Sequence, residues 1–350
     1  MTWLRVVLVL GLTASAAVHA DSPSADYRAA VAAYRKGDSI RAAELIGSIG
    51  SDAMKRAASS LIAETGDWRV PGAAALLHTE MVISGRASSN SDVSLHIGIA
   101  LEIVNNMQSR LARAGGDTTR ELAAFRERWY SLAATVFLSA TDPENASRFV
   151  SRGLSEFKKS ARLVMLDGVI EEMRAHLIYA DLHDRSIIAA MKPTPARQHQ
   201  LFAIKRYETA LEDDPSLNEA RLRLGRSLAL VNRVGPAREA LQQVAAISDD
   251  SRNTYLAQLF LGALSSYQRD YASARESFQA ALEIFPTCQT PYIALAFVER
   301  MTGHDEAARE LFDRFSSRRW VALEADPWWA YQNGGLDDDG LTWLQGRVRD

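Results

Sequence analysis

The chain has 350 residues, of which 47% are hydrophobic and 24% charged, a composition typical of a globular protein with one large or two ordinary domains. Its net charge of −3, with histidine neutral, does not suit a nucleic-acid-binding surface, which is normally basic. Cys288 is the only cysteine, so an intramolecular disulfide is excluded and the fold must be held by core burial.

Residues 1–20, MTWLRVVLVLGLTASAAVHA, have the features of a secretory signal peptide. Arg5 precedes an apolar run from Val6 to about Ala17, and the small residue Ala20 precedes a polar stretch. A membrane anchor is the alternative, but the run is shorter than the roughly 20 residues needed to span a bilayer. We therefore expect cleavage after Ala20, export to the periplasm or cell envelope, and no stable membrane span afterwards.

Residues 21–86 predict degenerate helical hairpins. In DYRAAVAAYRKGDSIRAAELIGSI, Ala30 and Ala42 are twelve positions apart, on either side of the turn sequence KGD. Small residues at that spacing let two antiparallel helices approach closely. The proline that would close such a unit is missing, because Met54 stands in its place.

Residues 87–195 are also helical by pattern, with a periodicity close to 3.6 residues in VSLHIGIALEIVNNMQSRLA and RELAAFRERWYSLAATVFLSA. Asp142 and Pro143 form a helix-start signal. Loops are expected at SGRASSNSD and AGGDTT, and no convincing strand pattern occurs anywhere in the chain. We interpret this region as divergent helical hairpins that are continuous with the hairpins of residues 196–319. A separate helical domain is the alternative.

Residues 196–319 contain an internal repeat. The small residues Gly225, Gly262 and Ala296 are separated by 37 and then 34 positions, and each follows a leucine. An alanine lies twelve positions after each of them, and a large apolar residue lies four positions after that alanine. Repetition at this period is typical of a solenoid.

The glycine has a physical role in this pattern. Gly262 and Ala274 would let the two helices of one hairpin cross closely. The glycine costs about 1 kcal/mol of helix propensity relative to alanine, which closer packing offsets. Pro286 then ends the second helix.

This order of residues resembles the tetratricopeptide repeat (TPR) family, and the chain looks like an exported bacterial-type TPR protein. The resemblance rests on Leu261, Gly262, Ala274, Phe278, Ala281 and Pro286. Three consecutive units between about Asn218 and Arg318 match well. The resemblance implies an all-α fold, an α-solenoid of antiparallel helix hairpins wound as a right-handed superhelix.

An earlier fourth unit matches only in part. It keeps the residues of a second helix, Ala203, Tyr207, Ala210 and Pro215. Met191 stands where the small residue of the first helix is expected, and KPTP at 192–195 would break the end of that helix.

Residues 320–350 change in character, because they are rich in aromatic residues and interrupted by glycines. The end of a solenoid exposes an apolar face that must be covered, so we expect a C-terminal aromatic cap. Its members would be Trp320, Trp328, Trp329, Tyr331 and Trp343. A glycan-binding accessory protein that uses the Trp328 and Trp329 patch is the alternative; exposed, coplanar indoles would favour it, and burial against Phe312 and Phe315 would oppose it.

No catalytic constellation stands out from the sequence. His78 and Glu80 are two positions apart and would face different sides of a helix, so a hydrogen-bonded histidine between packed helices is the simpler interpretation of His78. The chain has no glycine loop that could hold a phosphate and no metal-ligand spacing. We therefore expect no enzymatic activity, no cofactor and no metal.

In TPR arrays the first helix of each pair lines a concave groove that binds a peptide or a partner helix. Carried over by position, the resemblance gives three sets of groove residues: Glu219, Leu222, Arg226, Ala229 and Leu230; Leu256, Leu259, Ala263, Ser266 and Tyr267; and Thr290, Ile293, Phe297, Arg300 and Met301. Arginine and aromatic residues dominate binding hot spots, which favours Arg226, Tyr267, Phe297 and Arg300. Leu222 and Leu259 could equally pack against neighbouring helices.

The sequence thus predicts an exported TPR-type adaptor or scaffold whose partner is a protein or peptide and not a nucleic acid. A cell-envelope enzyme with a site between Ala87 and Pro195 is a further alternative, and buried ionisable side chains converging on a pocket there would favour it. The partner and the oligomeric state stay open. The expected segments are 1–20 (signal peptide), 21–86 (degenerate hairpins), 87–195 (divergent hairpins), 196–319 (TPR array) and 320–350 (cap).

Overall fold

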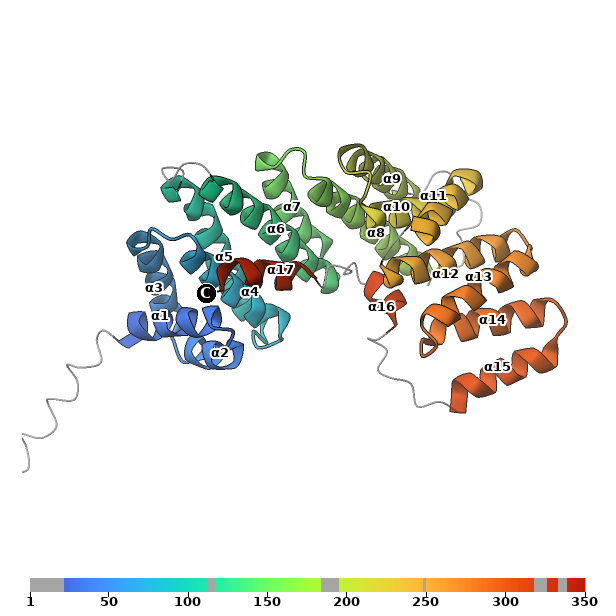
Figure 1. Ribbon diagram of the computed structural model, residues 1–350, viewed down its shortest axis with the longest axis horizontal. Helices are drawn as coiled ribbons and strands as arrows, with labels where there is room; N and C mark the ends of the chain where they lie inside the picture. The colour runs from blue at the N-terminus through green and yellow to red at the C-terminus, as the bar shows by residue number, and fades with distance from the viewer. Residues whose placement is uncertain are drawn as a thin grey trace, which may run out of the picture. The chain divides into compact units, whose positions relative to one another are not determined.

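The computed structural model describes residues 22–111, 117–183, 195–247, 250–317, 326–332 and 339–349. The regular elements among these residues are all helices, α1 to α17 (Figure 1). The predicted signal peptide and Trp320 lie outside the described residues. The helical fold class expected from the sequence is confirmed.

The chain forms two compact units, which we describe separately. The first unit takes its residues from Met1–Trp129 and Asp338–Asp350, and the second from Tyr130–Asp337. The first contains α1 (Ser22–Arg35), α2 (Ser39–Gly47), α3 (Ser51–Glu64), α4 (Arg69–Ile83), α5 (Asn90–Leu111), the first part of α6 (Asp117–Ser139) and α17 (Asp339–Val348). The second contains the rest of α6, α7 (Pro143–Glu156), α8 (Ala161–His183), α9 (Pro195–Asp213), α10 (Asn218–Leu230), α11 (Val234–Ile247), α12 (Ser251–Tyr267), α13 (Tyr271–Ile284), α14 (Gln289–Met301), α15 (Asp305–Ser317) and α16 (Pro327–Gln332).

In the first unit, α1 and α2 form the hairpin expected at KGD. Ala30 and Ala42 are both fully buried, and the two helices pack against each other. Gly37 has a φ of +85°, a conformation that favours glycine, and the Asp38 carboxylate accepts a hydrogen bond from the Arg41 N–H as the N-cap of α2. The turn chemistry of the sequence therefore does produce the hairpin.

The last helix of the chain, α17, packs against α4 in the same unit. Gln345 donates a hydrogen bond from Nε2 to Glu80 at 2.9 Å, and the Val348 carbonyl accepts one from Arg35 Nε at 3.1 Å. A β-carbon on Gly72 of α4 would lie 3.1 Å from a Val348 methyl group. The C-terminus is thus tied into the N-terminal hairpins.

The second unit is an array of antiparallel hairpins: α8 with α9, α10 with α11, α12 with α13, and α14 with α15 (Figure 1). Gly225 and Gly262 are crossing points, as expected, whereas Phe312, the large residue expected to fill the third crossing at Ala296, is 59% exposed. A β-carbon on Gly262 would lie 2.5 Å from the Phe278 ring, and one on Gly225 would lie 2.7 Å from Leu241. The large side chain of the second helix fills the space, while Ala274, the partner expected for Gly262, is buried in the same core.

The partly matched fourth unit is a complete hairpin whose first helix lies further upstream than the sequence suggested. Tyr207 of α9 packs against Gly168 of α8, where a β-carbon would lie 2.5 Å from the tyrosine ring. The crossing residue is therefore Gly168, and Met191 lies outside the described residues. The longer connection between α8 and α9 hid this glycine from the repeat pattern.

Candidate functional site

The first helices of the hairpins, α8, α10, α12 and α14, lie next to one another, and we call the face that they share the inner face. The predicted groove residues fall into two groups there. Leu222 is fully buried and Leu259 is 3% exposed, and both belong to the hydrophobic core. Of the two possibilities, exposure in the groove or packing against neighbouring helices, the structure shows packing. Their side chains therefore shape the face without being available at its surface.

The second group is exposed. Tyr267 is 75% exposed, Phe297 51% and Met301 49%, and Arg300 is exposed as well. Ser266 is half-buried, and its Oγ is enclosed without a hydrogen-bond partner among the described residues. Large apolar side chains in contact with solvent are the usual mark of an interaction surface when they gather in one place.

Two hollows gather part of this group. The first, of about 550 Å³, lies over α12 and α14 and is lined by Ala263, Ser266, Phe278, Thr290, Ile293, Ala294, Phe297, Trp328 and Trp329. The second, of about 490 Å³, lies between α14 and α15 and is lined by Ala296, Phe297, Arg300, Asp305, Ala308, Arg309 and Phe312. Phe297 lines both hollows. Tyr267 and Met301 lie outside them, as the last residues of α12 and α14.

The short helix α16, from the aromatic C-terminal segment, lies on this inner face. Trp328 packs on Phe260 of α12, with ring centroids 5.7 Å apart, and Tyr331 meets the same ring edge-on at 5.2 Å. Phe312 and Phe315 pair with each other instead, and Phe312 is 59% exposed. The aromatic segment that was expected to cover the end of the array thus covers part of its inner face in α16.

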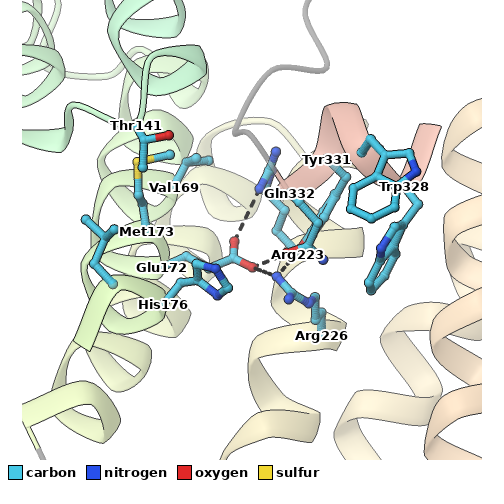
Figure 2. Close-up of a pocket in the computed structure, with 12 residues that line it drawn as sticks. Thr141, Val169, Glu172, Met173, His176, Arg223, Arg226, Trp328, Tyr331 and Gln332 are labelled. Atoms are coloured by element: carbon cyan, nitrogen blue, oxygen red, sulfur yellow. Dashed lines mark hydrogen bonds and ion pairs between the residues drawn. The ribbon is translucent and has the colours of Figure 1, made fainter. Parts of the chain in front are cut away.

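A buried ion cluster holds α16 against α8 and α10 (Figure 2). Glu172 of α8 accepts four hydrogen bonds: from Tyr207 at 2.8 Å, Arg223 at 3.2 Å, Arg226 at 2.5 Å and the Tyr331 hydroxyl at 2.9 Å. The Arg223 and Arg226 guanidinium carbons lie 4.4 and 5.0 Å from the centre of the Tyr331 ring. Arg226, expected as a groove residue, therefore already has an internal partner.

The electrostatics of the cluster match this geometry. Burial alone would raise the pKa of Glu172, but Arg226, Arg223 and the two tyrosine hydroxyls hold that pKa below its usual value. Burial and the negative charge of Glu172 raise the pKa of Tyr331. Glu172 is therefore ionised at neutral pH and the tyrosine is a neutral donor.

Glu172 lies within the region suggested for an enzyme site and borders a cavity of about 560 Å³. Its oxygens are nevertheless taken by four internal donors, and a general base or acid needs a pKa near the working pH, while that of Glu172 is lowered. The arrangement is that of a structural ion cluster. Repeat periodicity could not reveal Glu172, Arg223 or Tyr331, because their meeting depends on segments more than fifty residues apart.

The glycan alternative called for exposed, coplanar indoles. Trp329 is 43% exposed, but Trp328 is half-buried against Phe260. Trp343 lies in α17, in the other unit, with the Arg347 guanidinium over its ring at 4.8 Å. Trp328 and Trp329 therefore do not form one exposed platform.

His78 of the first unit is buried and hydrogen-bonded, as expected from the sequence. Its Nε2 lies 3.0 Å from the Tyr27 hydroxyl, and its Nδ1 lies 2.7 Å from Nδ1 of His96. Burial and the neighbouring His96 lower the pKa of His78 to about 3, so both imidazoles are neutral at neutral pH. Among the residues that the structure describes, no group of three or more His, Cys, Asp or Glu side chains is placed to hold a metal ion.

Comparisons with known proteins give fold neighbours only. No protein-family model matches the chain, and no curated protein is significantly similar to it. Among solved structures, the type IV pilus biogenesis factor PilW covers 63% of this chain and 91% of its own, with 17% identity and a TM-score of 0.45. A tetratricopeptide repeat protein from Parabacteroides merdae covers 77% and 98%, with 15% identity and a TM-score of 0.42.

A monomeric IFIT1 mutant, solved with m7Gppp-AAAA, covers 80% of this chain and 67% of its own, with 13% identity and a TM-score of 0.42. Because these TM-scores are below 0.5, we draw no conclusion from these neighbours about the partner or the activity of this chain. In the described part of the chain, no helix is both long and apolar enough to cross a bilayer. The hairpins and their glycine crossings identify the array of the second unit as a TPR-like α-solenoid.

Proposed function

We propose that the protein is an exported TPR-type scaffold that binds a partner protein or peptide on the inner face of its array and catalyses no reaction. The observation that carries this proposal is the cluster of exposed apolar side chains around the two hollows, chiefly Ile293, Phe297 and Trp329. Burial of one large apolar side chain contributes about 1.5–3 kcal/mol. A few such contacts are enough for a specific complex.

Charge would set the register of the partner. Arg300 lines the second hollow with Arg309 and Asp305, and neither arginine has an ion-pair partner among the described residues. Two cations and one anion at this edge favour an acidic group on the partner. Export and a place in the periplasm or cell envelope are part of the proposal, on the strength of residues 1–20.

The test is capture by crosslinking from the exported fraction, with the mature chain beside a variant in which Ile293, Phe297, Arg300 and Trp329 are changed to alanine. These side chains are exposed, so the variant should fold, and circular dichroism checks this. We expect capture to fall at least tenfold, since the loss of two or three such contacts exceeds the 1.4 kcal/mol that corresponds to tenfold in affinity.

The matched control changes exposed apolar side chains elsewhere in the same unit, Phe202 on α9 and Ile247 on α11, to alanine. Capture by this control should equal that of the unchanged chain. Equal capture by the inner-face variant and the unchanged chain would contradict the proposal. Capture of nucleic acid alone would contradict the partner class.

A further inference from the structure

The inner face holds a carboxylate in a site built for it. Asp326, 4% exposed, accepts hydrogen bonds at Oδ1 from the Tyr255 hydroxyl (2.9 Å) and the Trp328 N–H (3.0 Å). At Oδ2 it accepts hydrogen bonds from the N–H and the hydroxyl of Thr290, at 3.2 and 2.7 Å. Three of the four donors belong to the array and not to the segment that carries Asp326.

These three donors need a partner. Thr290 lies in the first turn of α14, where backbone N–H groups have no acceptor inside the helix. With the segment that carries Asp326 in place, Tyr255 is fully buried and Thr290 is half-buried. A carboxylate here gives all three donors one charged acceptor, and hydrogen bonds to a charged group are stronger than those between neutral groups.

A second site on the same face holds an aromatic hydroxyl. Tyr331, 1% exposed, lies under the guanidinium groups of Arg223 and Arg226 and donates its hydroxyl hydrogen to Glu172. Phe260 closes the side of this site. Figure 2 shows Glu172 and the two arginines turned toward Tyr331, with Trp328 beside them. The receptor groups again come from the array, here from α8, α10 and α12.

The residues that occupy the two sites, Asp326 and Tyr331, are five positions apart in the sequence, which corresponds to about one and a half turns of a helix. Beyond Trp329, the hollow over α12 and α14 continues to Ile293 and Phe297. The face thus has a carboxylate site, an aromatic-hydroxyl site and an adjoining apolar hollow.

We propose that the inner face is a receptor for short peptide segments in which a carboxylate is followed, five residues later, by a tyrosine, and that residues 326–332 are a resident copy of this ligand. The inference rests on the proposed function and adds the chemistry of the partner: an acidic and aromatic segment with one further apolar side chain for the hollow. A partner binds by replacing α16 at the two sites.

The experiment measures binding of a fluorescein-labelled peptide, DPWWAYQ, with blocked ends, by anisotropy. The receptor is the mature full-length chain in two forms, unchanged and released. The released form carries Asp326→Ala and Tyr331→Ala, which remove the two anchors of the resident segment and leave the receptor groups intact. We expect the released form to bind the peptide at least tenfold more tightly than the unchanged chain.

Two peptide controls test the chemistry. Asparagine in place of the aspartate, or phenylalanine in place of the tyrosine, should each weaken binding to the released form at least tenfold. Adding Tyr255→Phe to the released form should have a similar effect, because it removes one donor and keeps the ring. No peptide binding by a folded released form, or equal binding of all three peptides, would overturn the inference.

If circular dichroism shows that the released form is unfolded, the milder variant Asp326→Asn decides: tighter peptide binding than by the unchanged chain supports the inference, and equal binding overturns it. Failure here is distinguishable from failure of the proposed function. If the peptide does not bind but partner capture still depends on Phe297 and Arg300, the scaffold function stands and this partner chemistry falls.

Discussion

Gly262 is a position where the absence of a β-carbon is required by packing. A β-carbon would lie within 2.5–2.8 Å of three atoms of the Phe278 ring, which is itself 5% exposed and held in the core. Overpacking of this kind costs about 1–3 kcal/mol, more than the roughly 1 kcal/mol that alanine gains in helix propensity. Gly262→Ala should therefore lower the free energy of unfolding, measured by urea denaturation.

The matched control is Gly98→Ala in α5, since a β-carbon there would meet no atom within 4 Å. This exposed helical glycine should become more stable as alanine, by about 0.5–1 kcal/mol. Stabilisation by both substitutions would contradict the packing role of Gly262.

The buried pair of His78 and His96 predicts a pH dependence. The pKa of His78 is about 3 in the folded chain and 6.5 ordinarily, so the unfolded chain binds more protons between these values. The stability from the neutral imidazole is complete above about pH 6.5 and is lost as the pH falls toward 3, by about 1.4 kcal/mol per pH unit for one proton. Urea denaturation of the unchanged chain from pH 8 to pH 4.5 measures this slope.

His78→Gln should be less stable at pH 8 and should show a shallower loss of stability below pH 6.5. His176→Gln, at an exposed position, should keep the slope of the unchanged chain. An identical slope in the His78 variant and the unchanged chain would show that this imidazole does not govern the acid sensitivity.

At the scale of helices, the hairpins after Asn218 could be predicted from the repeat because each crossing uses neighbours in one short stretch: a small residue, a turn and a large apolar residue. The α8–α9 hairpin obeys the same packing rule with Gly168 and Tyr207, but they are 39 positions apart instead of 16. Period alone could not find that pair. The packing rule could find the pair, if every glycine in an apolar helix pattern were considered as a possible crossing point.

The position of α16 could not be predicted, for a different reason. Its aromatic residues indicated that it covers an apolar surface, but they did not indicate which one. What selects one is the meeting of Glu172, Arg223 and Arg226 with Tyr331, a combination of segments that carries no sequence period. The aromatic composition of the segment therefore predicted that it packs against an apolar surface, but it did not predict where α16 lies.

The ion cluster makes α8, α10 and α16 depend on one another. Glu172→Gln would leave Arg226 without its ion-pair partner, and it would leave Arg223, whose side chain is 1% exposed, with Glu219 alone. Breaking a buried ion pair from one side costs about 3–5 kcal/mol, so thermal unfolding of the second unit should shift strongly downward. Glu276→Gln, at an exposed position on α13, should change the free energy of unfolding by less than about 0.5 kcal/mol. Similar melting curves for both variants would rule out a structural role for the cluster.

At the scale of the whole molecule, the chain is expected to begin at Asp21 once exported. N-terminal sequencing or intact mass of the protein recovered from the periplasmic fraction measures this, and a substitution of Ala20 by a large charged residue should leave the leader attached. The comparison to make is with a chain whose residues 1–20 are deleted, which should stay in the cytosol. Recovery of the unchanged full-length chain from the cytosol, starting at Met1, would contradict export.

The seating of α16 on the inner face has a consequence for how the protein would respond to its partners. A tethered copy of a ligand acts at a local concentration on the order of millimolar, whatever the concentration of competitors in solution. It lowers the apparent affinity for every competitor by the same factor, so it leaves their ranking unchanged and raises the concentration at which any of them engages. The resident segment would then set a threshold: scarce, dispersed partners leave the face closed, and only partners that are abundant or clustered at one place open it.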